Sequence, residues 1–137
     1  MVAIFLVKNV SAQPDFPFYL PKSEIQAMEW LAEQTDPQTD LVLAYYPTGN
    51  YFPVLSDTRV FMGQFFMTVN FDEKLRQVEH FWQDDTSDSW RQAFLTEWHI
   101  TYIYQGRYEN ALHQDRFSPP GLLVYDQAGV KIYRVVP

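Results

Sequence analysis

Residues 40–63 read DLVLAYYPTGNYFPVLSDTRVFMG, and this stretch decides the fold because it places two strand patterns around a turn. Residues 41–46 form an apolar, partly aromatic run that is too short for a buried helix, so they predict a strand buried on both faces. Residues 49–55 predict a turn or a short helix, and residues 59–62 predict a second strand. Such an order, directly after a helix, is how an α/β sheet begins.

Helices are predicted on both sides of this stretch. The first starts near Ser23, carries apolar residues at helical spacing and stops at Asp36-Pro37. Residues 72–82 have the apolar face of a second helix. An acidic loop at residues 84–88 then precedes a third helix, which carries aromatic residues at helical spacing.

The last part of the chain predicts strands. Residues 99–104 alternate polar and apolar side chains, which favours a third strand. Residues 122–125 and 130–136 flank a tight turn at Gly129 and predict a hairpin. The fold class is therefore expected to be α/β, a three-layer Rossmann-like fold with a short, mostly parallel sheet and a C-terminal antiparallel hairpin.

The length of 137 residues suits one domain with a real core and is too short for two. We expect a single α/β domain at residues 21–137. Residues 1–20 are predicted to be an N-terminal linker or edge strand, or the end of a membrane-proximal segment, because residues 11–21 hold three prolines. The apolar run at residues 2–7 is far shorter than the roughly 20 residues that a membrane-spanning helix needs.

Composition excludes several classes of function. The net charge of −7 leaves no basic stripe for a phosphate backbone, so nucleic acid is not an expected partner. The chain has no Cys, which excludes disulfides, thiolate catalysis and Cys-ligated zinc. It also lacks a glycine-rich nucleotide fingerprint, a Walker lysine, a G-x-S-x-G elbow and H-E-x-x-H spacing. We therefore predict no cofactor, no metal site and no catalytic residue in this chain.

The best-placed candidate site is the turn Thr48-Gly49-Asn50-Tyr51, which follows the first predicted strand. Backbone amides there could hold an anion or a sugar hydroxyl. Asp57 and Arg59 flank the start of the second predicted strand and could add a polar clamp to this ligand-binding turn. The alternative interpretation is a Thr cap with a Gly that lets the chain turn, together with a surface ion pair.

Other polar and aromatic groups suggest less. The acidic cluster Asp84, Asp85 and Asp88 lacks the ligand pattern of a calcium loop and is interpreted as a helix-start cluster. The histidines have no zinc-ligand spacing; they are His80, His99 and His113. Aromatic residues near the turn could stack on sugar rings, although core packing or a partner-facing patch is their more ordinary use. They are Tyr45, Tyr46, Tyr51, Phe52, Phe65 and Phe66.

Four stretches together carry a family resemblance. They are PKSEIQAMEWLAEQTDPQTDLVLAYYPTGNYFPVLSDTRVFMG (21–63), DEKLRQVEHFW (72–82), WHITYIYQG (98–106) and GLLVYDQAGVKIYRVVP (121–137). In this order they resemble the soluble C-terminal domain of bacterial GT-C-class membrane glycosyltransferases, the relatives of protein O-mannosyltransferases and aminoarabinose transferases. The likeness spans about residues 18–136, and its specificity comes from the order of the pieces.

The resemblance implies a function for the parent protein more than for this domain. In that family, catalysis belongs to acidic residues in loops near the first membrane helices, which use a polyprenyl-phosphate sugar donor, and no such segment is present here. The chain would then be a non-catalytic domain on the extracytoplasmic (periplasmic or cell-surface) face. Its partners would be the membrane-embedded part of its parent and a glycan acceptor or lipid-linked sugar. Met1 would not be the natural start of that parent.

Two other classes stay open. A free-standing small-ligand or protein-binding α/β module would use the crevice at residues 48–51. A small enzyme has only scattered polar residues in its favour, and it would gain support from a buried carboxylate or histidine in a closed pocket beside the turn.

Overall fold

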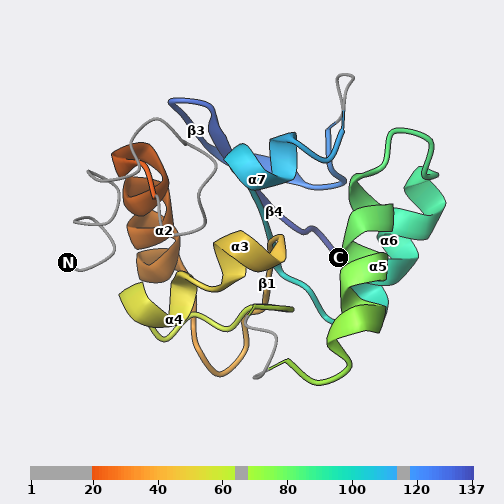
Figure 1. Ribbon diagram of the computed structural model, residues 1–137, viewed down its shortest axis with the longest axis horizontal. Helices are drawn as coiled ribbons and strands as arrows, with labels where there is room; N and C mark the ends of the chain where they lie inside the picture. Colours follow the sequence, from red (N-terminus) through yellow and green to blue (C-terminus); the bar gives the residue numbers. More distant parts are fainter. Residues whose placement is uncertain (1–19, 64–67, 114–117) are drawn as a thin grey trace.

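The computed structural model describes residues 20–63, 68–113 and 118–137, so the predicted linker at residues 1–20 lies almost wholly outside the described part (Figure 1). The longer helices are α2 (Lys22–Gln34), α5 (Phe71–Trp82) and α6 (Asp88–Glu97). Short helical turns are α3 (Tyr46–Gly49), α4 (Phe52–Leu55) and α7 (Arg107–Asn110). The strands are β1 (Val42–Leu43), β2 (Tyr102–Gln105), β3 (Leu122–Gln127) and β4 (Val130–Arg134). Within the described ranges, every helix is too short or too polar to cross a membrane.

The strands form one mixed sheet in the order β1-β2-β4-β3. β1 and β2 run parallel, with Leu43 opposite Ile103. β4 runs antiparallel to β2 on one side and to β3 on the other, which confirms the predicted C-terminal hairpin. On the other edge of β1, Val60 adds a single parallel bridge to Val42. The predicted α/β class is therefore confirmed.

The prediction of a mostly parallel sheet is wrong. Residues 59–62 contribute only the bridge at Val60, and β1 keeps just two residues because the chain turns into α3 at Tyr46. Pro47 lies in the first turn of α3, where its fixed φ suits a helix and its missing N–H would interrupt a strand ladder. Antiparallel pairings in the hairpin region consequently outnumber parallel ones.

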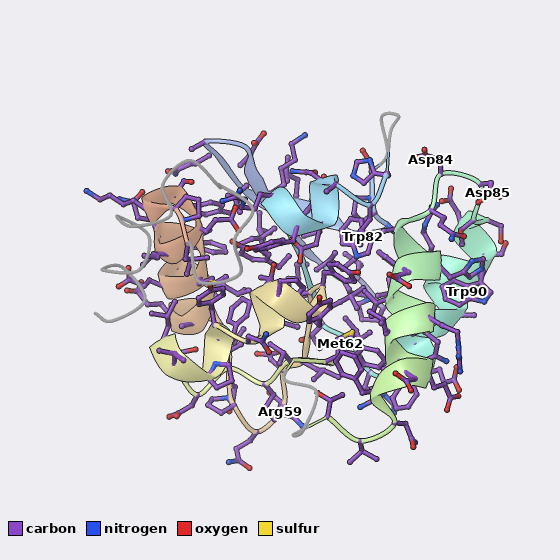
Figure 2. The ribbon with its side chains drawn as sticks, in the orientation of Figure 1. Arg59, Met62, Trp82, Asp84, Asp85 and Trp90 are labelled. Atoms are coloured by element: carbon purple, nitrogen blue, oxygen red, sulfur yellow. The ribbon has the colours of Figure 1, made fainter. Side chains whose placement is uncertain are left out.

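Alternating side chains give the sheet two apolar faces. Val42 and Tyr104 belong to the core cluster that includes Met28 of α2, whereas Leu43 and Ile103 belong to the cluster that includes Trp82 of α5. Figure 1 shows α2 and α4 on one side of the sheet and α5 and α6 on the other. Figure 2 shows Trp82 pointing from α5 toward the middle of the molecule. Burial on both faces explains why the short β1 is continuously apolar.

The corner between α5 and α6 is held by Arg91, which is 4% exposed. Its Nε donates a hydrogen bond to the Phe81 carbonyl at 2.8 Å, and its Nη2 donates to the Gln83 carbonyl. These carbonyls lie at the C-terminal end of α5, where backbone carbonyls have no N–H partner within the helix. The ion pair of Arg91 with Asp88 adds little, because the Asp88 side chain is 87% exposed.

We expect Arg91→Ala to lower the free energy of unfolding by about 2 kcal/mol, because it leaves the carbonyls of Phe81 and Gln83 without this donor. Urea denaturation followed by tryptophan fluorescence measures the change. Arg76→Ala, on the exposed side of α5, is the matched control and is expected to stay within about 0.5 kcal/mol of wild type. Equal losses in the two variants would contradict this role for Arg91.

Candidate functional site

The carboxyl ends of β1 and β2 meet at one edge of the sheet. β1 leads through Tyr45 into α3, and β2 leads through Gly106 into α7. After α3 the chain returns to the sheet at Val60, which pairs with one edge of β1, while β2 pairs with the other edge. The connection that follows β1 and the connection that follows β2 therefore diverge at this point. Open α/β sheets commonly form a ligand crevice where connections diverge in this way. In this protein, buried polar side chains fill that place.

Glu109 of α7 lies between the two strand ends and is completely buried. Its Oε2 accepts a hydrogen bond from the Tyr45 backbone N–H at 2.7 Å, and its Oε1 accepts one from the Gly106 backbone N–H at 3.0 Å. The buried Thr48 hydroxyl also lowers the pKa of this carboxyl. The hydroxyl lies near the carboxyl without meeting the geometric criteria of a hydrogen bond. Glu109 therefore ties the end of β1 to the start of α7.

Glu24 of α2 is a second buried carboxyl, and it lies next to the first residues of α7. Its Oε1 accepts a hydrogen bond from the Tyr104 hydroxyl at 2.8 Å, and its Oε2 accepts one from the Arg107 backbone N–H at 3.2 Å. Gly106 permits this approach, because a Cβ there would lie 2.3 Å from Glu24 Oε1. The α2 helix is thereby fixed to the end of β2.

Burial raises the pKa of these groups. Desolvation raises the pKa of Glu109 from 4.5 to about 7, against the lowering effect of the backbone donors, that of Tyr45 first. Desolvation also raises the pKa of Glu24, opposed by the Tyr104 hydroxyl and by Arg107. The pKa of Tyr104 is raised as well, first by burial and then by the negative charges of Glu24 and Glu109. The folded chain therefore holds the carboxyl protons more tightly than the unfolded chain does.

A buried carboxylate in a closed pocket beside the turn would favour a small enzyme, and Glu109 is buried near Thr48. Its two oxygens, however, accept hydrogen bonds from backbone N–H groups. A general acid or base must also reach a substrate proton, and Glu109 does not line the cavity described below. Its contacts are those of a group that holds two loops together.

The predicted ligand-binding turn is divided between two environments. Thr48 is buried on the side of Glu109, whereas Gly49 and Asn50 line a cavity on the other side. Tyr51 is the N-cap residue of α4 and is half-buried. Burial first, and the neighbouring Tyr108 second, raise the pKa of its hydroxyl to about 12. The four residues therefore do not converge on a single ligand position.

Gly49 is required by close packing of the backbone. A Cβ at this position would lie 2.0 Å from the Met62 carbonyl oxygen and 3.1 Å from the Cα of Gly63. The alternative interpretation of Gly49, a residue that serves the chain path, is therefore supported by this contact. The contact also brings the segment after Val60 against α3.

We expect Gly49→Ala to lower the free energy of unfolding by about 2 kcal/mol, because the new methyl group must displace the Met62 backbone. The sign of the change in stability distinguishes the two cases. Ala is a better helix former than Gly by about 1 kcal/mol, so the substitution would stabilise the protein if the helical site were unhindered. Thermal denaturation measures the effect. A variant more stable than wild type would show that the close contact does not constrain this turn.

Asp57 and Arg59 lie away from the turn and are both exposed. Figure 2 shows the Arg59 side chain pointing outward from the body of the molecule. No ion pair joins Asp57 to Arg59 in the described part of the chain. The alternative surface ion pair is therefore not formed in this structure, and the clamp stays a prediction.

A cavity of about 390 Å³ opens between α3, α4 and the start of α5. Its walls combine apolar side chains with Asn50, Thr68 and Lys74. The apolar residues that line it are Pro53, Val54, Val60, Phe61 and Val69. Mostly apolar walls with a few polar groups are typical of small-ligand sites.

Sequence reasoning missed the residues that matter most here. Lys74 was one helix residue among several, and nothing local marked it as a wall of the cavity near Asn50. Glu24 and Tyr104 are 80 residues apart and carried no shared motif. Of these residues, only Glu109 could have been recognised from the sequence. Gly106 and Glu109 have the spacing of a capping box, in which the side chain at the third helical position accepts a hydrogen bond from the N-cap N–H.

The acidic loop lies far from this cavity. Figure 2 shows Asp84 and Asp85 at the outer end of the loop between α5 and α6. Across the residues that the structure describes, no three His, Asp or Glu side chains gather as metal ligands would. His80 instead contacts the Trp90 ring, with centroids 4.3 Å apart.

Comparison with protein-family models, with curated proteins and with solved structures finds no match to this chain. The resemblance to GT-C-class domains therefore stays a prediction. Function is inferred below from the geometry of the cavity and from the order of the elements along the chain.

Proposed function

We propose that this chain is a non-catalytic recognition domain of a multi-spanning membrane glycosyltransferase-like protein. It would lie on the extracytoplasmic face, attached to the membrane-embedded part of its parent, and help to hold an acceptor or a lipid-linked sugar. A Rossmann-like arrangement in three layers is part of this proposal. The observation that carries it is the cavity beside the Gly49-Asn50 turn, which joins polar groups to apolar walls.

The use of the buried carboxyls supports a binding role over a catalytic one. Glu24 and Glu109 each accept hydrogen bonds that fix the ends of secondary-structure elements. Glycoside and sugar-transfer chemistry needs carboxyls that face the reacting bond. The carboxyls that are buried in the described part of the chain thus have structural partners, while the open cavity offers an amide, a hydroxyl and an ammonium group.

Exposed apolar residues at the cavity mouth support an attachment to another surface. Val54 is 78% exposed and Val69 is 74% exposed, and both line the cavity. Leu55, next to Val54, is also exposed. Apolar side chains that cluster on a surface commonly mark an interaction site. A partner that covers this rim would also shield a ligand in the cavity from water.

The parent reading frame tests the proposal. We expect apolar segments of about 20 residues upstream of Val2, the length of membrane-spanning helices. A fusion of alkaline phosphatase to the C-terminus of the full protein should be active, because that reporter folds only outside the cytoplasm. A parent without such segments, or an inactive phosphatase fusion with an active β-galactosidase fusion, would exclude the membrane-protein proposal.

A second candidate is the free-standing ligand-binding module. It is favoured by the same cavity, whose described walls are all contributed by this chain. The two candidates differ in the reading frame. A complete protein that starts at Met1 and still binds a small ligand at Asn50 would favour the free-standing module.

A further inference from the structure

The short helix α7 carries a buried carboxyl close to solvent. Glu109 is completely buried, whereas the next residue, Asn110, is exposed, and Arg107 and Tyr108 are half-buried. One side of α7 therefore faces water, and Figure 1 shows the helix near the top of the molecule, above α3. A small outward movement of α7 would bring the Glu109 carboxyl into contact with water.

Hydrogen bonds to carboxyl oxygens hold the start of α7 in place. Glu109 accepts one from the Gly106 N–H at 3.0 Å and one from the Tyr45 N–H at 2.7 Å. Glu24 of α2 accepts one from the Arg107 N–H at 3.2 Å. Isolated helices need about 12–15 residues to be stable, and α7 has four. The position of α7 therefore depends on contacts of this kind.

The two carboxyls differ in how their negative charge is compensated. At Glu24 the charged Arg107 side chain opposes the effect of burial, together with the Tyr104 hydroxyl. The groups that oppose burial at Glu109 are neutral: the N–H groups of Tyr45 and Gly106 and the Thr48 hydroxyl. Neutral donors replace the hydration of a carboxylate less well than a cation does. Glu109 is therefore the carboxyl whose ionised form is held least well in the buried position.

Other titratable groups surround these two carboxyls and their neighbours. They are Tyr45 before α3, Tyr51 before α4, Glu79 of α5, Tyr104 of β2, Tyr108 of α7, Tyr125 of β3 and His113 after α7. Burial raises the pKa of Tyr45, Tyr51 and Tyr104, so their hydroxyls stay neutral to high pH. Glu79 accepts a hydrogen bond from the Tyr45 hydroxyl, and His113 contacts Gln105. These two groups need controls in any test at neutral pH.

From this arrangement we infer that α7 is a pH-sensitive latch. It stays docked on the ends of β1 and β2 while Glu109 carries its proton, and it undocks, turning about Gly106, when that proton passes to solvent. Undocking hydrates the carboxylate and releases the Tyr45 N–H. Tyr45 leads into α3, which contributes Gly49 to a wall of the cavity, so the latch also loosens that wall. The inference goes beyond the proposed function, because it holds whatever the cavity binds.

The latch closes in acid and opens as the pH rises. Desolvation raises the pKa of Glu109 from 4.5 to about 7 in the docked position, and hydration on undocking returns it toward 4.5. The docked state therefore holds this proton more tightly and loses ground to the undocked state as the pH rises through this range. Between about pH 5.5 and about pH 8 the undocked population should grow roughly twentyfold.

Amide hydrogen exchange of the whole chain tests the latch. Exchange rates at Tyr45, Gly106 and Arg107, divided by those of unstructured peptides, should rise about tenfold or more between about pH 5.5 and about pH 8. Low urea concentrations should leave them nearly unchanged, because a local opening exposes little surface. The amides of Ile132 and Tyr133, in a strand that pairs on both sides, should instead accelerate with urea.

The urea dependence can overturn the inference by itself. If the amides of Tyr45, Gly106 and Arg107 depend on urea as steeply as those of β4, they open only when the whole chain unfolds and α7 is no latch. If their corrected rates do not change with pH, α7 does not respond to the ionisation of Glu109. Neither result bears on the parent reading frame, so the latch and the proposed function stand or fall separately.

Variants identify the group that controls the latch. Glu109→Gln removes the ionisable group, so the rise in exchange with pH should shrink to less than about threefold. Glu79→Gln and His113→Gln keep Glu109, are the matched controls, and should respond to pH as wild type does. A tenfold rise that persists in Glu109→Gln, or that disappears in either control, would mean that another group controls α7. If Glu109→Gln does not fold, the urea dependence of the wild type and the two controls still decide.

Discussion

Glu109→Ala is expected to lower the free energy of unfolding by about 4 kcal/mol, because it leaves two buried backbone N–H groups, each of which costs roughly 1–3 kcal/mol when unpaired. Glu109 is fully buried and its hydrogen bond to the Gly106 N–H is buried, while its hydrogen bond to the Tyr45 N–H is partly buried, so water replaces the lost acceptor poorly. The loss should loosen the end of β1 and the start of α7 together. Few single substitutions in a chain of this size cost as much.

Urea denaturation at about pH 6 measures this loss, and hydrogen exchange of the Tyr45 and Gly106 amides locates it. Glu33→Ala, an exposed glutamate of α2, is the matched control and is expected to change stability by less than about 0.5 kcal/mol. Both amides should exchange faster in Glu109→Ala than in Glu33→Ala. If Glu109→Ala behaves like its control, the carboxyl does not join the two strand ends.

The pH dependence of stability is the second large effect. Glu109 has a pKa of about 7 in the folded chain, raised by desolvation from 4.5. The folded state therefore binds this proton more tightly than the unfolded state. Its contribution to stability is complete below pH 4.5 and is lost as the pH rises through about 7. Because the two values differ by about 2.5, the loss amounts to about 3 kcal/mol.

Comparison with Glu109→Gln isolates this contribution from other titrating groups. Denaturation of both proteins at about pH 5 and about pH 8.5 should show a fall in stability that is larger in wild type by about 2.5 kcal/mol, because a small part of the loss has already occurred at about pH 5. Glu24, whose pKa is also raised by burial, titrates in both proteins and cancels from the difference. Equal slopes in the two proteins would mean that Glu109 titrates when folded as it does when unfolded.

Local patterns predicted much of the fold. The run before Asp36-Pro37 became α2, residues 72–82 became α5 with one added residue, and the Gly129 turn closed the hairpin. Each of these elements depends on side-chain periodicity and on a breaker or turn residue nearby. Such signals lie within about one element of sequence, so a single sequence contains them.

The second strand could not be predicted in this way. Residues 59–62 have a strand pattern, yet only Val60 pairs with β1, because Gly49 and Gly63 bring α3 against the segment and the chain leaves the sheet. The start of the first helix, predicted near Ser23, also depends on more than a local cap, since α2 begins at Lys22 after Pro21 and no side chain caps it. Both outcomes depend on contacts between elements rather than on local preference.

The candidate site shows the same division. The sequence pointed to the Thr48-Gly49-Asn50 turn, and the structure places a cavity there, but Lys74 and the buried Glu109 came from elements far along the chain. Asp57 and Arg59, chosen because they were near in sequence, face solvent. Proximity in sequence did not place these two charged groups in the lining of the described cavity, because helices and strands carry neighbouring residues to opposite faces.

The sequence by itself determined the class of the fold, the positions of the principal helices and the hairpin, since periodicity and turn chemistry are local properties. Only the tertiary structure decided that residues 40–63 form a two-residue strand and a wall of a cavity. It also decided that the place between β1 and β2 is filled by carboxyls. The physical reason is that burial is a property of the packed chain: desolvation raises the pKa of Glu109 and leaves Asn50 Oδ1 without a donor only after remote elements have closed around them.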